Sequence, residues 1–475
     1  MNDAAVSMGV TSLDAVAIFG YFGILVVLGY LTRRNKTFNE FALGKHSIPA
    51  MMIFASLVAT IVGPGFSVGF TAKGYDTGYL FFFLCLSYPL QTIVSGLLLA
   101  PRLTRHRDCA TLGDIMNKSY GRFAQFLTGV ISVGLLIGFT AIMGKIGGSM
   151  LQSITGWPLL ACLAVVTGST ALLTFTGGLR ATIATEAFQF SLFSVIVPVM
   201  LLLAVWQSPI SLAEQSAKAW ELTSSGFESM SGLALFGVVI SFMLGEILLP
   251  PYANRALAAK SSEGSVSGFV MAGVYTIVWL GIVGVLGVIA HSYLPAGTSA
   301  DSVFIAMGKQ LLPVGLYGVL LAAVIAIVMS SQESVLNSGA VAFVKDIVSV
   351  FSAPTEKNAL LLGKISTLGM AAVAIYVAQF APSIIDGLLI LYSIWAPTML
   401  IPLVAALYGW RTTPTSGWLS IILGGGVSLT WQLLLHEPAG IPAILVGIVG
   451  SMVGFLIGRL INTSNKAITS PENAS

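Results

Sequence analysis

Long apolar runs, separated by short polar stretches, extend over almost the whole chain. Each run is close to the length of about 20 residues that an α-helix needs to cross the hydrocarbon core of a bilayer. We therefore predict an all-α polytopic membrane protein with about 13 transmembrane helices. The mixed run 292–312 predicts an external loop with a short amphipathic helix. The predicted spans are 13–32, 48–74, 77–100, 121–152, 157–175, 182–206, 230–254, 265–290, 313–343, 360–381, 384–409, 416–434 and 440–461.

The composition narrows the class of protein further. Of the 475 residues, 56 % are hydrophobic and only 9 % are charged, whereas soluble domains carry about 25 % charged residues. A water-soluble enzyme and a disordered chain are therefore both excluded. The lipid bilayer is the first partner that the sequence implies, and the formal net charge of +3 gives no support to nucleic-acid binding. The three cysteines show neither metal-ligand nor disulfide spacing.

The basic residues predict an orientation in the membrane. With 13 spans, all 22 Lys and Arg residues except Lys73, Lys145, Lys218 and Lys309 fall on one side, Arg255 included. The positive-inside rule makes that side cytoplasmic. We therefore expect a multi-pass protein of the cell (inner) membrane with its N-terminus outside and its C-terminus in the cytoplasm. Residues 1–475 are expected to form a single membrane domain, in which 462–475 are a disordered cytoplasmic tail.

Two of the predicted spans contain helix-breaking residues near their middle. The span 48–74 contains Gly63-Pro64-Gly65, and the span 230–254 contains Gly245-Glu246 followed by two prolines. One break alone is equally well explained as a proline kink in a packed helix. The two broken spans lie five apart, however, and broken helices at matching positions of two halves are typical of inverted-repeat transporters with a binding site at the membrane midplane.

The span 313–343 carries an unusual number of side-chain oxygens for a membrane helix. Ser330, Ser334, Asn337 and Ser338 recur every three to four residues, so they share one face of the helix. Hydrogen bonding between helices would explain them in part. A monovalent cation also needs several oxygen ligands, and these hydroxyls together with carbonyls freed at the break of 48–74 could supply them.

Four stretches resemble the sodium:solute symporter family, whose members have the LeuT fold. They are the broken span at 59–66, the sequence TFTGGLRATIATEAFQF at 174–190, the serine-rich IVMSSQES at 327–334 and, more weakly, 249–261, in which Asn254 stands where the family has Gln. Within the family, the sequence is most similar to the branch of the high-affinity choline transporters. That branch has a Trp where this chain has Ile61, however, which argues against choline as the solute. The resemblance implies a leading helix (13–32), two five-helix inverted repeats (48–206 and 230–409) and two trailing helices (416–461).

The resemblance also implies where cations bind. The main sodium site of the family matches the backbone carbonyls and hydroxyls of Ala59, Val62, Ile327, Ser330 and Ser331. A second site that occurs in some members falls on Glu186, Glu333 and Ser334. Two glutamates replace the expected shorter side chains there. Such a site could hold a cation, carry a proton, or pair with a basic residue, and the glutamates could also face a wet vestibule.

Ionisable residues inside spans are costly, and each is therefore a functional candidate. We expect the solute to bind at the helix breaks, near Thr60, Gly63, Phe66 and Glu246. Lys145 is a further candidate for substrate binding, because its ammonium could bind a carboxylate, whereas Glu246 could accept an amine or guanidinium. The alternatives are that Lys145 and Glu246 pair with each other, or that both reach water.

These observations predict a sodium-coupled secondary active symporter, not an enzyme, that imports a small organic solute by alternating access. Sodium is then both the transported and the coupling ion, and the protein is expected to be a monomer or a weak oligomer. A proton-coupled transporter that uses Glu186 or Glu333 is one alternative. A transporter-like membrane sensor that works with a separate output protein is another. The sequence leaves the solute open.

Overall fold

The structure, a computed structural model, describes the backbone of residues 11–32, 37–43, 47–381 and 384–468. These residues are helical almost throughout, because a chain in lipid must pair its backbone groups internally. The β-type contact in this part of the chain is an isolated bridge between Ile48 and Ala259. The α-helices are α1 (Ser12–Thr32), α2 (Phe38–Leu43), α3 (Ala50–Ile61), α4 (Phe70–Thr77), α5 (Leu80–Cys85), α6 (Ser87–Val94), α7 (Ala100–Leu103), α8 (Leu112–Tyr120), α9 (Arg122–Thr155), α10 (Leu159–Trp206), α11 (Leu212–Ser229), α12 (Gly232–Leu244), α13 (Pro250–Ala258), α14 (Ser262–Ile289), α15 (Val303–Leu311), α16 (Leu316–Ala342), α17 (Ser349–Phe351), α18 (Glu356–Ala378), α19 (Ile384–Leu407), α20 (Pro414–Leu429) and α21 (Ala443–Ile468). Short π-helical or 3₁₀ segments are η2 (Gly65–Gly69), η3 (Ser95–Leu99), η4 (Ala290–Ser292), η5 (Ala300–Ser302), η6 (Phe343–Val348), η7 (Thr430–Leu434) and η8 (Pro438–Gly440).

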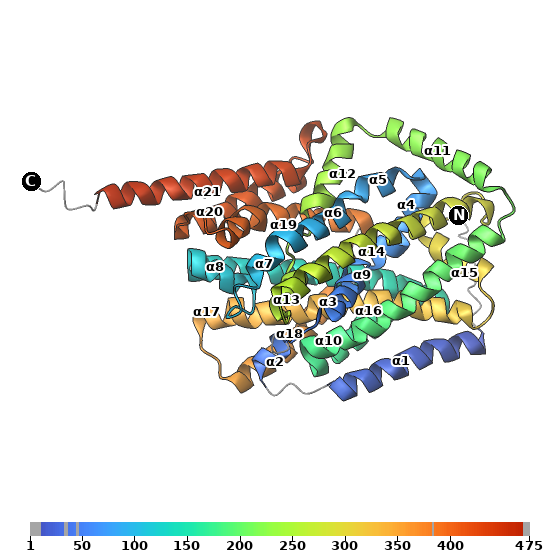
Figure 1. Cartoon of the computed structure of the whole chain (residues 1–475), viewed down its shortest axis with the longest axis horizontal. Helices are drawn as coiled ribbons and strands as arrows, with labels where there is room; N and C mark the ends of the chain where they lie inside the picture. The colour runs from blue at the N-terminus through green and yellow to red at the C-terminus, as the bar shows by residue number, and fades with distance from the viewer. Residues whose placement is uncertain (1–10, 33–36, 44–46, 382–383, 469–475) are drawn as a thin grey trace, which may run out of the picture.

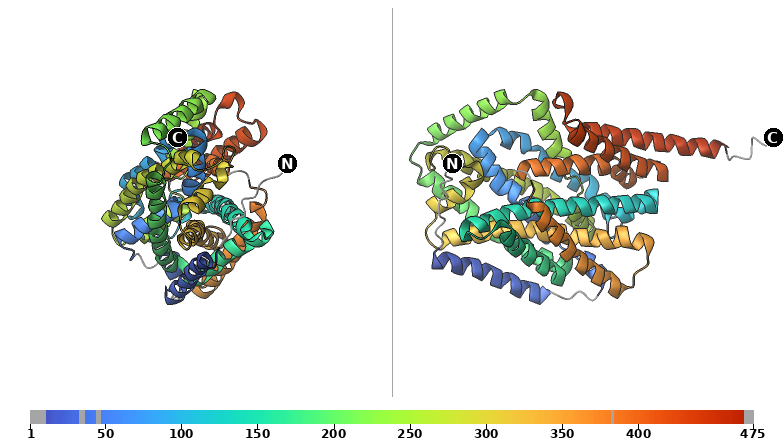
Figure 2. Two further views of the ribbon diagram at one scale, coloured as in Figure 1. Left: turned by 90° about the vertical axis from the view of Figure 1, so that its right-hand side faces the viewer. Right: turned by 180° about the vertical axis from the view of Figure 1, so that it is seen from behind.

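The long helices lie side by side along the long axis of the molecule (Figure 1). One end carries α4, α11 and α15, and the opposite end carries α2, α8 and α17 (Figures 1 and 2). The C-terminal helix α21 packs along α20 and extends beyond the other helices at the second end. This arrangement is that of a helical bundle long enough to cross a membrane, with short connections at both ends.

The number of spans depends on how broken helices are counted. In the described part of the chain, ten helices are long and apolar enough to cross a membrane, or up to twelve if each of two bent pairs forms one span. The 48 residues of α10 include all of the predicted span 182–206 and residues 159–175 of the span 157–175, and Gly178 lies between them with φ 60° and ψ −174°. Glycine adopts this conformation without steric cost. The multi-span all-helical architecture is confirmed, and the exact count of 13 stays a prediction.

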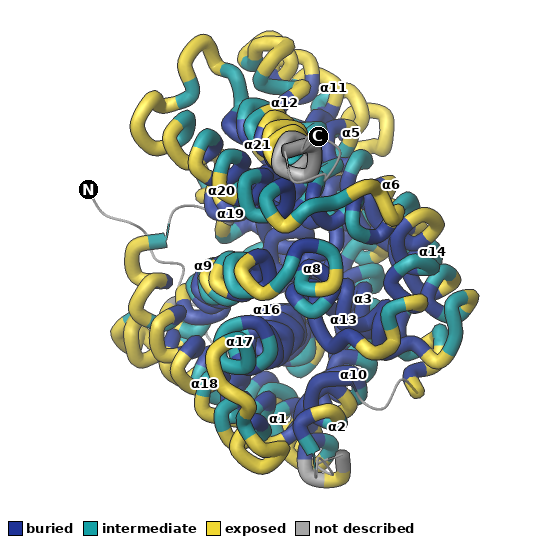
Figure 3. The backbone as a smooth tube through the Cα atoms, turned by 90° about the vertical axis from the view of Figure 1, so that its left-hand side faces the viewer, coloured by how far each residue is buried: buried dark blue, intermediate teal, exposed yellow. Residues whose placement is uncertain are grey.

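The serine-rich helix α16 lies at the centre of the bundle. In the most apolar 18-residue stretch of α16, 94 % of the residues are buried. The corresponding share for α1, at the periphery, is 22 %. Figure 3 shows the same contrast, with α16, α3 and α13 in the buried interior and α1 and α18 at the exposed edge. Helices α3, α9, α10 and α18 all contact α16. A helix enclosed by protein rather than lipid can carry polar side chains, because its neighbours supply hydrogen-bonding partners.

Small residues allow α4 to pack tightly against α14. A Cβ atom on Gly287 would lie 2.2 Å from Thr71 O, and one on Gly74 would lie 2.5 Å from Gly284 O. Close approach of helix backbones through small residues is a common way to pack helices in membranes. The second half of the broken span is thereby fixed in position relative to α14.

Several connecting segments differ from the sequence prediction. Helix α11 was not predicted, although Ser211 and Glu214 form a capping box at its start. The predicted short helix within 292–312 is present as α15. Helix α21 ends at Ile468, and the predicted disorder of the tail 462–475 stays a prediction. Residues 469–475 lie outside the described part of the chain.

Candidate functional site

The first predicted break forms between α3 and η2. After Ile61 the chain leaves the helical range at Val62, with φ −77° and ψ 50°, and helix resumes after Pro64 at an angle of 64° to α3. Residue 64 has no N–H to offer to Thr60 O, because it is proline. The carbonyls in the last turn of α3 therefore lack part of their helical hydrogen bonding and are available to other donors or to a cation.

Two serines of α16 contact these carbonyls. Ser330 Oγ lies 2.8 Å from Ala59 O and 3.0 Å from Ile327 O. Ser331 Oγ lies 3.4 Å from Ala59 O and 3.3 Å from Thr60 O. Both serines have no exposed surface. Four of the five expected sodium ligands therefore meet in the interior, where α3 ends beside the middle of α16.

Val62, the fifth expected ligand, has no such contact with the two serines. Its carbonyl accepts a hydrogen bond from Ser67 Oγ at 3.5 Å, and no hydrogen bond among the described residues links it to Ser330 or Ser331. Gly63 does approach α16 closely, since a Cβ atom at this position would lie only 2.9 Å from Ser331 Oγ. A side chain at 63 would therefore displace the Ser331 hydroxyl.

Glu186 is held in a buried ion pair. Its Oε1 lies 2.8 Å from Arg255 Nη2, and neither side chain has exposed surface. Ser56 and Ser334 also donate hydrogen bonds to this carboxylate. Arg255 Nε donates to Ser56 Oγ at 3.0 Å, and Thr60 Oγ1 lies 2.6 Å from Ser334 Oγ. This network connects α3, α10, α13 and α16. It lies within one helical turn of the contacts between Ser330, Ser331 and the carbonyls at the end of α3.

Glu333 belongs to a different environment, although it precedes Ser334 in the chain. Successive residues of a helix point about 100° apart, and Glu333 Oε2 accepts a hydrogen bond from Thr185 at 2.6 Å. Its other oxygen is buried and has no hydrogen-bond partner in the described structure. Of the expected group, Glu186 and Ser334 are hydrogen-bonded to each other, and Glu333 contacts α10 through Thr185, the residue next to Glu186.

The second predicted break forms between α12 and α13. The chain turns at residues 245–249, where Leu248 has a φ of 52°. Glu246 lies in this turn and accepts hydrogen bonds from the hydroxyls of Tyr88, Tyr252 and Tyr392, the last at 2.6 Å. The side chain is almost wholly buried. Tyrosines from three separate segments thus meet on one carboxylate.

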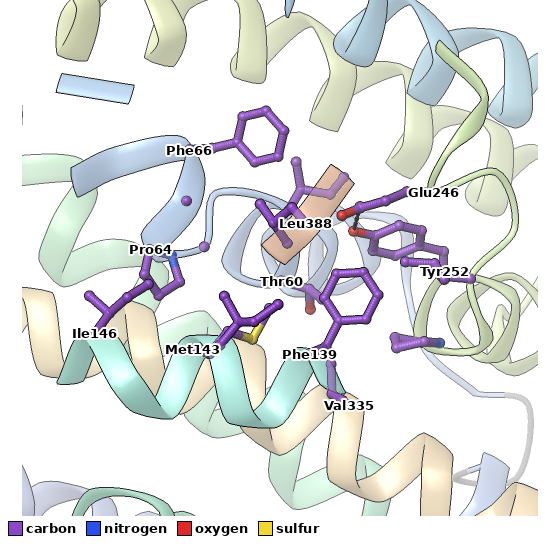
Figure 4. A pocket seen from close by; sticks show the side chains of 16 residues that line it. Thr60, Pro64, Phe66, Phe139, Met143, Ile146, Glu246, Tyr252, Val335 and Leu388 are labelled. Carbon is purple, nitrogen blue, oxygen red and sulfur yellow. Dashed lines mark hydrogen bonds between the residues drawn. The ribbon is translucent and has the colours of Figure 1, made fainter. Parts of the chain in front are cut away.

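A cavity lies between the two breaks. Glu246 and Tyr252 are on one side of it, and Pro64, Met143 and Ile146 are on the other (Figure 4). The space open to water-sized molecules is about 30 Å³, which is room for about two waters. The side chains therefore leave little free space in the cavity in this conformation. Its lining residues are Thr60, Ile61, Gly63, Pro64, Gly65, Phe66, Phe139, Ile142, Met143, Ile146, Glu246, Leu249, Pro251, Tyr252, Val335 and Leu388.

The structure does not bring Lys145 to this cavity. Its ammonium group donates a hydrogen bond to the carbonyl of Ala381, at the end of α18. Ile142, Met143 and Ile146 of the same helix line the cavity, and Lys145 points away from them. Lys145 is therefore not among the residues that line the cavity, and no hydrogen bond or ion pair joins it to Glu246 in the described part of the chain.

Sequence reasoning missed several residues that complete the site. Arg255 was counted with the cytoplasmic basic residues, but it is fully buried. Its position in the weakly matching stretch 249–261 was the available signal. Tyr252 lies in the same stretch, whereas Tyr88 and Tyr392 carried no signal in the sequence, because their segments meet Glu246 only in the folded chain.

Comparison with known proteins identifies the family. The model of the sodium:solute symporter family matches residues 41–425. The sodium/pantothenate symporter of Escherichia coli K12 is 27 % identical over 470 residues, which cover 93 % of this chain and 94 % of the relative. The sodium/proline symporter of the same organism is 25 % identical over 486 residues, with 96 % and 94 % covered.

A solved structure shows the same fold. A Na⁺-coupled sialic acid symporter, in a substrate-bound outward-open state, matches with a TM-score of 0.83 and 16 % sequence identity, over 95 % of this chain and 97 % of that one. The helical bundle is thus a LeuT fold, and the relatives are transporters rather than enzymes. The family match covers most of the chain, including both helix breaks and the serine-rich helix. The chain is therefore a multi-pass membrane transporter that belongs to the sodium:solute symporter family.

Proposed function

We propose that the protein imports a small organic solute together with sodium by alternating access. The observation that carries this proposal is the contact of Ser330 and Ser331 with the carbonyls at the broken end of α3. Family membership supports sodium as the coupling ion. Neutral oxygens suit sodium, because they can coordinate a single positive charge without fixing a neutralising carboxylate beside it.

The proposed sodium ligands are the carbonyls of Ala59, Val62 and Ile327 and the hydroxyls of Ser330 and Ser331. Each hydroxyl now donates to a carbonyl, but a hydroxyl also has two acceptor lone pairs and its hydrogen can rotate away from a cation. A sodium ion between α3 and α16 would join the broken span to the central helix. We expect it to favour the form that is open to the outside.

We propose that a single sodium ion is coupled to each solute. The guanidinium of Arg255 lies beside Glu186 and so provides a positive charge where the resemblance implies a second cation. One charge that crosses a potential of 100 mV yields about 2.3 kcal/mol, and a tenfold sodium gradient adds about 1.4 kcal/mol. Together these energies support an accumulation of about 500-fold at a 1:1 ratio.

The solute is proposed to bind in the cavity between the two breaks. Thr60, Gly63, Phe66 and Glu246 were expected near the solute, and all four line this cavity. Because its present volume admits only about two waters, the solute must enter a more open conformation. Relatives are named for pantothenate and proline, so the family name alone leaves the chemical class of the solute undecided.

The proposed arrangement in the membrane follows the sequence prediction. Residues 13–32 form the leading helix, 48–206 and 230–409 the two inverted repeats, and 416–461 the trailing helices. The end that carries α2, α8 and α17 faces the cytoplasm of a cell membrane, and the N-terminus is outside. The placement of α3 and α12 as the broken helices of the two halves supports this division.

The sodium site can be tested by thermal unfolding of the purified protein in sodium and in potassium at equal ionic strength. A ligand that binds only the folded form at a hundredfold excess over its Kd stabilises it by about 2.7 kcal/mol. We expect sodium to raise the unfolding temperature, and Ser330→Ala and Ser331→Ala each to lose most of this rise. Ser338→Ala is the matched control, because Ser338 lies on the same helix and contacts Asn254 instead. Equal stability in the two cations would contradict the sodium site.

Proton coupling is a second candidate, and the unpartnered oxygen of Glu333 favours it. A proton on this carboxyl group would lower the cost of burying it. In liposomes, uptake driven by a pH gradient without sodium and abolished by Glu333→Gln would support this candidate. Uptake that requires sodium and persists in Glu333→Gln would exclude it.

A further inference from the structure

The carboxylate of Glu246 has an unusual set of neighbours. Tyr88 and Tyr252 donate to Oε2, Tyr392 donates to Oε1 at 2.6 Å, and the hydroxyls of Tyr88 and Tyr252 lie 3.0 Å apart. Among the residues that the structure describes, no Lys, Arg or His side chain forms an ion pair or hydrogen bond with Glu246. This contrasts with Glu186, which is paired with Arg255.

The phenol hydroxyls satisfy hydrogen bonds but carry no charge that would balance the carboxylate. A buried unpaired charge is costly inside a membrane protein, and such residues typically contact substrate or ions. An ionised carboxyl group can accept about four hydrogen bonds. Oε2 already accepts two, whereas Oε1 accepts one, from Tyr392. Oε1 can therefore accept a further donor, and the residue lines the cavity from which that donor would come.

Aromatic rings surround the same part of the cavity. Phe66, Phe139 and Tyr252 line it. Phe66 stacks on Tyr88 with ring centroids 4.3 Å apart, so that its position is fixed by the tyrosine that holds Glu246. The faces of aromatic rings attract cations, and a carboxylate attracts them further. In Figure 4 Phe66 and Phe139 lie on either side of the space toward which Glu246 is directed.

We propose that the solute carries a protonated amine, which binds between the Glu246 carboxylate and the rings of Phe66, Phe139 and Tyr252. The inference rests on the proposed function, because it assumes that the solute occupies this cavity. It goes further by excluding solutes that have no cationic group, such as a simple carboxylate or sugar. The remaining lining, which includes Met143, Ile146 and Leu388, would contact an apolar part of the solute.

The test compares two probes of the same shape. Pyrrolidine is protonated at neutral pH, whereas tetrahydrofuran has the same five-membered ring and no charge. The unfolding temperature of the full-length protein is measured with each compound over the same millimolar range, in sodium and in potassium. We expect pyrrolidinium to raise the unfolding temperature and tetrahydrofuran to leave it unchanged. Equal effects of the two compounds, or no effect of either, would overturn the proposal.

Variants locate the binding of the probe. Glu246→Gln keeps a polar group that can accept the phenol hydrogens but removes the charge, and we expect it to weaken pyrrolidinium binding about tenfold or more. Glu263→Gln makes the same change on the exposed start of α14 and should have no effect. Retention of full pyrrolidinium affinity in Glu246→Gln would overturn the proposal.

The sodium response separates failure of this inference from failure of the proposed function. If sodium stabilises the protein but pyrrolidinium and tetrahydrofuran act alike, the amine proposal fails and sodium coupling stands. If sodium has no effect, the proposed function fails, and the comparison of the two probes in potassium still tests the binding of a cation at Glu246.

Discussion

At the scale of single residues, the ion site depends on oxygens that helix-breaking residues release. Pro64 cannot donate to the carbonyl of Thr60, and Gly63 leaves room for Ser331 beside the break. Ser330 and Ser331 then reach backbone oxygens that a continuous helix would have paired internally. The proposed ion site therefore depends on Gly63 and Pro64, which shape the backbone, and on no charged side chain.

This dependence predicts that Gly63→Ala impairs sodium binding. The added Cβ would lie 2.9 Å from Ser331 Oγ and must displace it. Overpacking of this kind costs about 1–3 kcal/mol, so we expect sodium affinity to fall about tenfold. The measurement is a sodium titration of the unfolding temperature. Gly134→Ala is the control, because a Cβ there meets no atom within 4 Å, and unchanged affinity in Gly63→Ala would contradict the role of Gly63.

At the scale of elements, one buried network connects four helices beside the ion site. Glu186 of α10 and Arg255 of α13 form the ion pair, and Ser56 of α3 and Ser334 of α16 complete its hydrogen bonds. The position of α13 after the second break is thereby tied to the helix that precedes the first break. The network thus links the two broken spans, whose movement alternating access requires.

We predict that Glu186→Gln and Arg255→Met are each strongly destabilising, by about 3–5 kcal/mol, because each leaves an uncompensated buried charge. The double variant should regain part of this loss, since it leaves neither charge. Denaturant unfolding of the single and double variants measures the coupling free energy. Glu221→Gln breaks an exposed ion pair with Lys218 and should cost less than about 1 kcal/mol. Additive losses in the double variant would show that the pair is not coupled.

At the scale of the whole molecule, the bundle presents an apolar exterior to lipid and keeps its polar residues around α16. The two ends of the bundle carry different connections, with α15 at one and α17 at the other. The proposed orientation puts the α15 end outside, because the sequence prediction assigns most of the basic residues to the other side of the membrane. Solute and sodium would enter at the α15 end and leave at the other.

Cysteine labelling tests this orientation. We expect an impermeant thiol reagent to label Ser299→Cys in intact cells and to label Ser352→Cys only after permeabilisation, because both positions are exposed at opposite ends of the bundle. Labelling in the reverse order would invert the proposed orientation. Background from Cys109 should be low, since burial raises the pKa of its thiol to about 11. Its labelling should increase as the pH rises toward that value, because the thiolate is the reactive form.

The sequence alone determined the class of protein, the positions of both helix breaks and the oxygen-bearing face of α16. These features are local: apolar runs long enough to cross a bilayer, proline and glycine within them, and hydroxyls at helical spacing are all visible in a linear chain. The family resemblance added the sodium ligands, and the fold brings four of those five together.

Only the tertiary structure decided which partners the buried charged residues contact. Arg255 is paired with Glu186 rather than exposed to the cytoplasm, Lys145 is turned away from Glu246, and three tyrosines converge on that glutamate. Arg255 and Glu186 are 69 positions apart in the chain, and Tyr88 and Tyr392 are 158 and 146 positions from Glu246, whereas Tyr252 is only six residues from it. The interaction of a buried charge depends on which groups lie within a few ångströms of it. Hydrophobic periodicity predicts which face of a helix is buried, but it does not specify which side chain of another helix that face contacts.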